Sequence, residues 1–199
     1  MSGAPGNYLP ADPPADPWVL LTDWLPSNES PDRPQMIVST VNAHGEPDAR
    51  TLLISEFDEH GFYFHTDSRS RKVADITANL AVALTVLWPN FTRQLVVQGR
   101  AEVAPAEEQA RAYDRRSPYL KQLAWLNDSA NAQLPHAERR ARWAAFRDAH
   151  PVFDQPDTWI GFLVRPHRLT FWGSDPDAAS RRAEYTLVDG EWVLGFLPG

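Results

Sequence analysis

The fold of this chain is indicated most clearly by residues 81–104, AVALTVLWPNFTRQLVVQGRAEVA. Two runs rich in β-branched residues flank the letters PNFT, so this stretch predicts a long β-hairpin. Further short strands are predicted before it, at 35–41, 49–55 and 62–66, and after it in TWIGFLVR, HRLTFWG, RAEYTLV and EWVLGFL. Many short strands with few helical insertions indicate a mainly β fold of the α+β class, arranged as a closed antiparallel barrel.

Helices are predicted between these strands. Asp16 and Pro17 suit the start of a short helix that ends by Pro26, and other helices are expected at about 70–79, in PAEEQARAYDRR and at 135–150. Residues 1–16, rich in Pro, Gly and Ala, predict a flexible N-terminal arm. Residues 17–199 then form a single domain without internal repeats.

Composition excludes several classes of function. The chain has 199 residues, a formal net charge of −7 and a pI near 5.3, which argues against a nucleic-acid or anionic-membrane binder. The absence of cysteine excludes disulfides and thiolate sites, and the six histidines form no metal-binding pattern. The N-terminus lacks the features of a signal peptide and no run is long enough to span a membrane, so we expect a cytoplasmic protein.

The stretch HTDSRSRKVADI, residues 65–76, places Arg71 and Lys72 at the start of a predicted helix with Ser70 as N-cap. A helix N-terminus already carries partial positive charge, so cations there suit a negatively charged ligand. A phosphate held by Arg50, Thr66, Arg71 and Lys72 would explain the arrangement. The alternative is a solvated surface partly balanced by acidic neighbours, and spacing alone leaves both interpretations open.

Several motifs follow one another in an order that resembles the pyridoxamine 5′-phosphate oxidase family. They are DPWVLLTDWL, PQMIVSTVNAHGEPDARTLLI, GFYFHTDSRSRK, ANLAVALTVLWPNFTRQLVVQGRAE, IGFLVRPHRLTFW and GEWVLGFLPG. The resemblance runs from about residue 16 to the C-terminus. It implies an FMN-binding split β-barrel, assembled as a homodimer with FMN at the subunit interface, in a divergent member of the family.

Carried over residue by residue, the resemblance implies a nearly intact FMN site. Arg50 would contact the FMN phosphate, and the backbone that follows would run along the flavin, over Thr51, Leu52, Leu53, Ile54 and Ser55. Other implied cofactor contacts are His65, Thr66, Arg71, Lys72, a Gln94 that reaches in from the partner subunit, and the C-terminal pair Trp172 and Arg182. AWLNDSA resembles the family's next flavin segment loosely, with Asp128 and Ser129 as its polar residues.

The departures from the family concern the substrate. Tyr113 is retained, but Ser117 replaces an Arg, Ser55 replaces a Lys, and an Arg-Leu-His triplet is replaced by Ala178, Ala179 and Ser180. Each hydrogen bond to a charged group is worth about 1.5–3 kcal/mol, so these losses disfavour a phosphorylated pyridine. Tyr113, Ser117 and Ser180 are the implied substrate contacts.

The function implied is an FMN-dependent oxidase that acts on a small flat substrate, with hydride transfer to flavin N5 and reoxidation by dioxygen. No side chain is singled out as catalytic, because the cofactor carries the chemistry. One alternative is a genuine pyridoxine or pyridoxamine 5′-phosphate oxidase, with Arg115, Arg116 or Arg181 compensating. Another is a flavin- or deazaflavin-binding protein without turnover.

Overall fold

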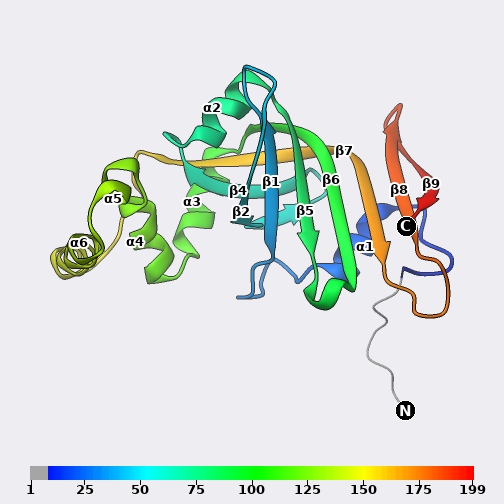
Figure 1. Ribbon diagram of the computed structural model, residues 1–199, viewed down its shortest axis with the longest axis horizontal. Helices are drawn as coiled ribbons and strands as arrows, with labels where there is room; N and C mark the ends of the chain where they lie inside the picture. The colour runs from blue at the N-terminus through cyan, green and yellow to red at the C-terminus, as the bar shows by residue number, and fades with distance from the viewer. Residues whose placement is uncertain (1–8) are drawn as a thin grey trace, which may run out of the picture.

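The computed structural model describes residues 9–199 and consists of one antiparallel sheet with helices at its ends (Figure 1). The strand order is β2–β1–β5–β6–β7–β4–β3, with β8 beside β7 and β9 beside β8. The strands are β1 (Gln35–Val41), β2 (Pro47–Leu53), β3 (Glu56–Asp58), β4 (Gly61–Asp67), β5 (Ala81–Leu87), β6 (Arg93–Val103), β7 (Trp159–Gly173), β8 (Arg181–Val188) and β9 (Glu191–Pro198). The mainly β class with helical insertions is confirmed.

Strand β7 explains why the barrel is split. It pairs with β6 along its length, whereas its other edge is shared between β4, at residues 159–164, and β8, at residues 168–172. The chain after β2 then reaches β4, since the Ser55 amide donates to the Tyr63 carbonyl at 2.8 Å. The sheet therefore closes on one side of β7, while β8 and β9 diverge from it as a separate hairpin (Figure 1).

The core lies inside the barrel and is built by alternation along the strands. On β1, Met36 and Val38 are buried while Ile37 and Ser39 face outward. Helix α1 (Pro17–Trp24) closes one end of this core, and its Trp24 packs edge-on against Phe171 at 5.2 Å between ring centroids. Burying each large apolar side chain stabilises the fold by about 1.5–3 kcal/mol, so the inward-facing residues supply most of the stability. The outward-facing residues are therefore not needed for the core and can contact a ligand or another chain.

The remaining helices interrupt the strands. Helix α2 (Arg71–Ala78) lies between β4 and β5, and η1 (Pro89–Phe91) forms the tip of the β5–β6 hairpin. Between β6 and β7 come α3 (Ala106–Asp114), α4 (Pro118–Leu126), α5 (Ser129–Gln133) and α6 (His136–Ala149). Helices α4, α5 and α6 lie beyond the end of the sheet where β7 begins (Figure 1). None of the helices in residues 9–199 is long and apolar enough to cross a membrane.

Some elements differ from the sequence expectation. The two strands predicted around Pro166 form one strand, β7, because Pro166 lies opposite Gly99 where the β6–β7 register shifts, and a bulge tolerates the missing amide. A Cβ on Gly99 would collide with the Arg165 carbonyl oxygen, so glycine permits this close approach. The region predicted as a turn after residue 55 contains the short strand β3, and β2 begins and ends two residues earlier than predicted.

The N-terminal arm is described only in part. Residues 1–8 lie outside the described residues. In the part that is described, the Pro14 carbonyl accepts a hydrogen bond from the Tyr185 hydroxyl at 2.7 Å, and the Ala11 carbonyl accepts one from Arg181. The flexibility of the arm stays a prediction.

Candidate functional site

The residues expected at the FMN phosphate meet at one end of the barrel, around the N-terminus of α2. Lys72 Nζ donates to Thr66 Oγ1 at 3.0 Å. Arg50 Nη2 and Arg71 Nε lie 2.8 and 2.9 Å from the same oxygen, Asp48 Oδ2. The barrel strands β2 and β4 and the helix α2 thus bring together the cations that the sequence had scattered over 22 positions (72 − 50).

Arg50 is held firmly in this cluster. Its Nη1 donates to Thr40 Oγ1 at 2.8 Å and to the Val38 carbonyl at 3.2 Å. Thr40 in turn donates to Asp75 Oδ2, at 2.7 Å, on the buried face of α2. Burial, and then the positive charge of Arg50, lower the pKa of Lys72 below the ordinary lysine value. Arg50 and Arg71 already pair with Asp48, and Arg50 also lies 3.5 Å from Asp75, whereas no carboxylate in residues 9–199 forms an ion pair with Lys72. Lys72 is therefore the cation of the cluster that a neighbouring anion would relieve most directly.

The start of α2 adds hydrogen-bonding groups to these charges. Ser70 occupies the N-cap position as predicted, but its side chain makes no capping hydrogen bond, and its hydroxyl lies 3.5 Å from the Thr66 hydroxyl. The Arg71 side chain is 80% exposed, so it can turn toward an incoming ligand. Hydroxyls, two guanidinium groups, an ammonium group and a helix N-terminus form a donor set suited to a phosphate.

The segment expected along the flavin continues from this cluster. Thr51 faces outward, Leu52 and Leu53 are half-buried, and Ile54 is buried in the core. Ser55 reaches the far end, where it lines a cavity. The segment thus connects the cation cluster to that cavity.

The other predicted flavin contacts form a row across three strands. Gln94 on β6 pairs with Trp172 on β7, and Trp172 pairs with Arg182 on β8, so the three side chains share one face of the sheet. Trp172 Nε1 donates to Ser180 Oγ at 3.0 Å, and the Phe91 ring lies 4.6 Å from the Trp172 ring. The structure therefore brings together Gln94, Trp172, Arg182 and the proposed substrate residue Ser180.

This row and the cation cluster are separate within one chain. Strands β1 and β5 lie between β2, which carries Arg50, and β6, which carries Gln94. Three strand spacings correspond to about 14 Å along the sheet. A single chain therefore presents two half-sites.

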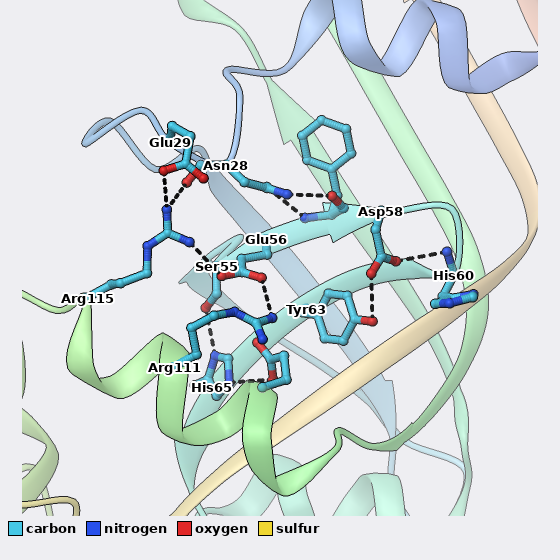
Figure 2. Close-up of polar contacts among 12 residues, drawn as sticks. Asn28, Glu29, Ser55, Glu56, Asp58, His60, Tyr63, His65, Arg111 and Arg115 are labelled. Atoms are coloured by element: carbon cyan, nitrogen blue, oxygen red, sulfur yellow. Dashed lines mark hydrogen bonds and ion pairs between the residues drawn. The ribbon is translucent and has the colours of Figure 1, made fainter.

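His65, a predicted cofactor contact, lies in a buried chain of hydrogen bonds (Figure 2). Its Nδ1 is 2.8 Å from Ser55 Oγ, and its Nε2 is 3.1 Å from Glu108 Oε2. The His65 and Glu108 side chains are 1% and 5% exposed, and the imidazole stacks on Trp159 at 4.8 Å. The Ser55 hydroxyl at the cavity wall is thus connected to a buried imidazole and carboxylate.

The contact of His65 with Ser55 and Glu108 was not predicted from the sequence. Ser55 and His65 are 10 positions apart, and His65 and Glu108 are 43 positions apart. No local pattern marks such residues, because their contact depends on how α3 packs against β4 and β7. The only available clue was a histidine placed inside an apolar strand, GFYFHT.

The cavity has a volume of about 590 Å³ and lies between β2, the loop before β1, and the ends of α3 and α4. Ser117 lines it and also caps α4, accepting a hydrogen bond from the Leu120 amide at 3.3 Å. Tyr113 is buried, and its hydroxyl donates to the Asp154 carbonyl at 2.7 Å. Asp128 caps α5 through the Asn131 amide, at 2.7 Å. Of the proposed substrate residues, Ser117 therefore lies at this cavity and Ser180 beside Trp172.

Comparisons with known proteins agree with this geometry. The family described as pyridoxamine 5′-phosphate oxidase matches residues 28–147. A pyridoxine/pyridoxamine 5′-phosphate oxidase of Streptomyces avermitilis is 36% identical over 162 residues, covering 79% of this chain and 72% of the relative. An enzyme of the same name from Haemophilus influenzae is 33% identical over 160 residues, which cover 79% of this chain and 76% of that enzyme.

Solved structures share the fold. The PhzG structure from Burkholderia lata, in complex with tetrahydrophenazine-1-carboxylic acid, has a TM-score of 0.83 and 21% identity, covering 98% of this chain and 100% of that chain. A pyridoxamine 5′-phosphate oxidase-related, FMN-binding protein from Nostoc punctiforme has a TM-score of 0.68 and 17% identity, covering 83% and 88%. With its split barrel and its matched relatives, the chain belongs to the pyridoxamine 5′-phosphate oxidase family of flavin oxidoreductases.

Proposed function

We propose that this protein is an FMN-dependent oxidase. The observation that carries the proposal is the cluster of Arg50, Thr66, Arg71 and Lys72, whose charges and hydroxyls fit a phosphate dianion. Bound FMN would supply the redox chemistry, taking a hydride at N5 and returning the electrons to dioxygen as hydrogen peroxide. The protein's own task is then to hold the phosphate, orient the isoalloxazine along residues 51–55 and position the substrate.

We propose that a second copy of the chain completes the site. On the outer face of β2, β1, β5 and β6, nine neighbouring paired positions carry no charged side chain, and a charge appears only farther along β6, at Arg100 opposite Ala81. An uncharged patch of this kind is typical of the centre of a subunit interface. These positions are Ala49, Thr51, Ile37, Ser39, Ala83, Thr85, Leu87, Gln94 and Val96. A homodimer through this face would bury it and bring the Gln94 row of one subunit toward the cation cluster of its partner.

The substrate proposed is small and flat. Ser55 and Ser117 line the cavity at positions where the family resemblance expects Lys and Arg, so the cavity lacks those two cations. The second candidate function is oxidation of pyridoxine 5′-phosphate. It is favoured by the relatives named pyridoxine/pyridoxamine 5′-phosphate oxidase, which are 33–36% identical to this chain. Incubating purified protein with pyridoxine 5′-phosphate decides between them, since efficient aldehyde formation would overturn the preferred substrate class.

The cofactor proposal is tested by the absorption spectrum of protein purified without added flavin, with mass analysis of the released ligand. We expect FMN in the wild type and its loss from the double variant Arg71→Ala, Lys72→Ala. Two charged hydrogen bonds are worth about 3–6 kcal/mol together, or roughly a 10²- to 10⁴-fold loss of affinity.

The matched control is Arg69→Ala, which removes a neighbouring arginine that is engaged with Asp67 at 2.6 Å. This variant should retain FMN. Equal loss from both variants would mean that general surface charge, and not the cluster, holds the ligand. A colourless wild type that takes up a deazaflavin instead would contradict the proposal.

A further inference from the structure

The cavity is lined by three arginines, and two of them are already neutralised or fully hydrogen-bonded. Arg33 donates to the backbone carbonyls of Ser55 at 2.8 Å and of Asn28 at 2.8 Å, besides others in the same loop. Arg115 pairs with Glu29 at 2.9 Å and with Glu56 at 3.0 Å (Figure 2). Neither guanidinium group is available for a ligand without breaking these contacts.

Arg116 is different. Its guanidinium carbon lies over the Trp159 indole, 4.4 Å from the ring centroid. Within residues 9–199 no carboxylate pairs with it, although the adjacent Arg115 and the nearby Arg111 both pair with Glu56. Burial lowers the pKa of Arg116 to about 10, so it remains charged at neutral pH but in an unfavourable setting. A partly desolvated cation without a counter-ion is costly, and a bound anion would relieve that cost.

The surroundings of Arg116 restrict the kind of anion. Leu53, Ala112 and Leu120 make part of the cavity wall apolar, whereas the Trp159 ring is already covered by Arg116 and His65. A guanidinium group binds a carboxylate through two parallel hydrogen bonds. The charged residues that line the cavity are three arginines and two glutamates, Glu29 and Glu56, so its formal charge is +1 and favours a ligand with a single negative charge. The volume of about 590 Å³ is that of a site for a small organic molecule.

We propose that Arg116 is the anion anchor of this cavity and that the ligand is a planar aromatic monocarboxylate. The carboxylate would bind the Arg116 guanidinium, and the ring system would lie in the apolar part of the cavity. The identification of this ligand as the substrate rests on the proposed function, whereas its binding to Arg116 does not. Binding itself needs no flavin and can be measured alone.

The test is calorimetric titration of the purified protein with 2-naphthoate and with its uncharged isostere 2-naphthamide. We expect naphthoate to bind at least tenfold more tightly than the amide. Arg116→Met should reduce naphthoate affinity to the level of the amide without changing amide binding. The matched control Arg115→Met removes the adjacent, already paired arginine and should change naphthoate affinity by less than threefold.

Two further measurements keep the test decisive. If Arg116→Met fails to fold, Arg116→Lys keeps the charge without the fork and should bind naphthoate less tightly than the wild type. Phenyl phosphate should bind the wild type more weakly than naphthoate. Equal affinities for acid and amide, equal losses in the Arg115 and Arg116 variants, or a preference for phenyl phosphate would overturn the proposal.

The outcome can be separated from that of the cofactor proposal. Arg116→Met should retain as much FMN as the wild type, because Arg116 is not part of the cluster formed by Arg50, Arg71 and Lys72. Selective naphthoate binding by a protein without FMN would support the anchor and refute the oxidase. A protein that holds FMN but binds naphthoate and naphthamide equally would support the cofactor proposal and refute the Arg116 anchor.

Discussion

Lys72 carries its charge in a half-buried position beside a second cation, Arg50, and this proximity sets its chemistry. Its hydrogen bond to Thr66 holds it in place, but no described carboxylate forms an ion pair with it. Burial and the Arg50 charge therefore lower the pKa of Lys72. Arg71, on the neighbouring position, is exposed and paired with Asp48. Two adjacent basic residues thus have different electrostatic roles.

This difference predicts a pH dependence for FMN binding. Lys72 attracts the phosphate only while its amine is protonated. Because its pKa is lowered, the amine loses its charge as pH rises, before the ordinary lysine pKa of 10.5 is reached. Affinity should therefore decline with rising pH earlier than for an ordinary lysine. Lys72→Arg, which stays charged, should not show this decline.

Flavin fluorescence titrations from pH 7 upward would measure both affinities. Their ratio cancels any titration of the flavin itself, and we expect the ratio of wild-type to Lys72→Arg affinity to fall with pH. A ratio that stays constant would show that Lys72 does not contact the phosphate.

At the scale of elements, the docking of α3 on β7 organises the cavity. Gln109 on α3 donates to the Ala104 carbonyl at 2.7 Å and accepts from the Gly161 amide at 3.0 Å. Its neighbour Glu108 meets His65, which lies directly opposite Gly161 in the β4–β7 pairing. The absence of a side chain at Gly161 leaves room for the hydrogen bond between His65 and Glu108, which joins α3 to the sheet.

Gly161→Ala should therefore destabilise the protein. A Cβ at this position would lie 2.7 Å from His65 Nε2, and overpacking of this kind costs about 1–3 kcal/mol. Urea unfolding should show a lower midpoint with an unchanged slope. Gly195→Ala on β9 is the control, since its Cβ would meet nothing nearer than 4.0 Å, and we expect equal or slightly higher stability. An unchanged urea midpoint for Gly161→Ala would mean that His65 can move away from the new methyl group without loss of stability.

At the scale of the whole molecule, the split of β7 between two neighbours separates the two half-sites. The barrel side carries the cation cluster, and the β7–β8 side carries the Trp172 and Arg182 pair. The outer face of β2, β1, β5 and β6 lies between them, and it is uncharged at the nine neighbouring positions given above. Two chains facing each other through this surface would place each cluster near the partner's row, which a single chain cannot do.

Ile37→Lys tests this arrangement. Ile37 is 42% exposed and lies between Thr51 and Thr85, two of the uncharged outward positions, so a lysine there should not disturb the core. In a dimer it would bury a charge, and we expect sedimentation to give the monomer mass of 22.4 kDa, with loss of FMN. The wild type should have twice that mass.

Val152→Lys is the control for surface charge. Val152 is 73% exposed, on the connection between α6 and β7, and its replacement should leave both the dimer and the flavin intact. A wild type that sediments as a monomer with bound FMN would contradict the two-chain site.

Local sequence patterns predict most of the strands, the main helices and the basic start of α2, but not the short strand β3 or the continuity of β7. Alternation along residues 35–41 and 81–104, and the Ser-Arg-Lys start of α2, are local features that depend on backbone periodicity and on nearby charges. The order of motifs also determined the family, which the matched relatives confirm. These conclusions needed no knowledge of distant contacts.

Which charged side chains form ion pairs, and which do not, depends on how distant elements pack. Arg115 and Arg116 are adjacent in the sequence, yet Arg115 meets Glu29 and Glu56 while Arg116 lies on Trp159. The bond between His65 and Glu108 likewise joins residues 43 positions apart. The physical reason is that burial and ion pairing depend on how elements pack, and packing brings together residues that no local pattern relates.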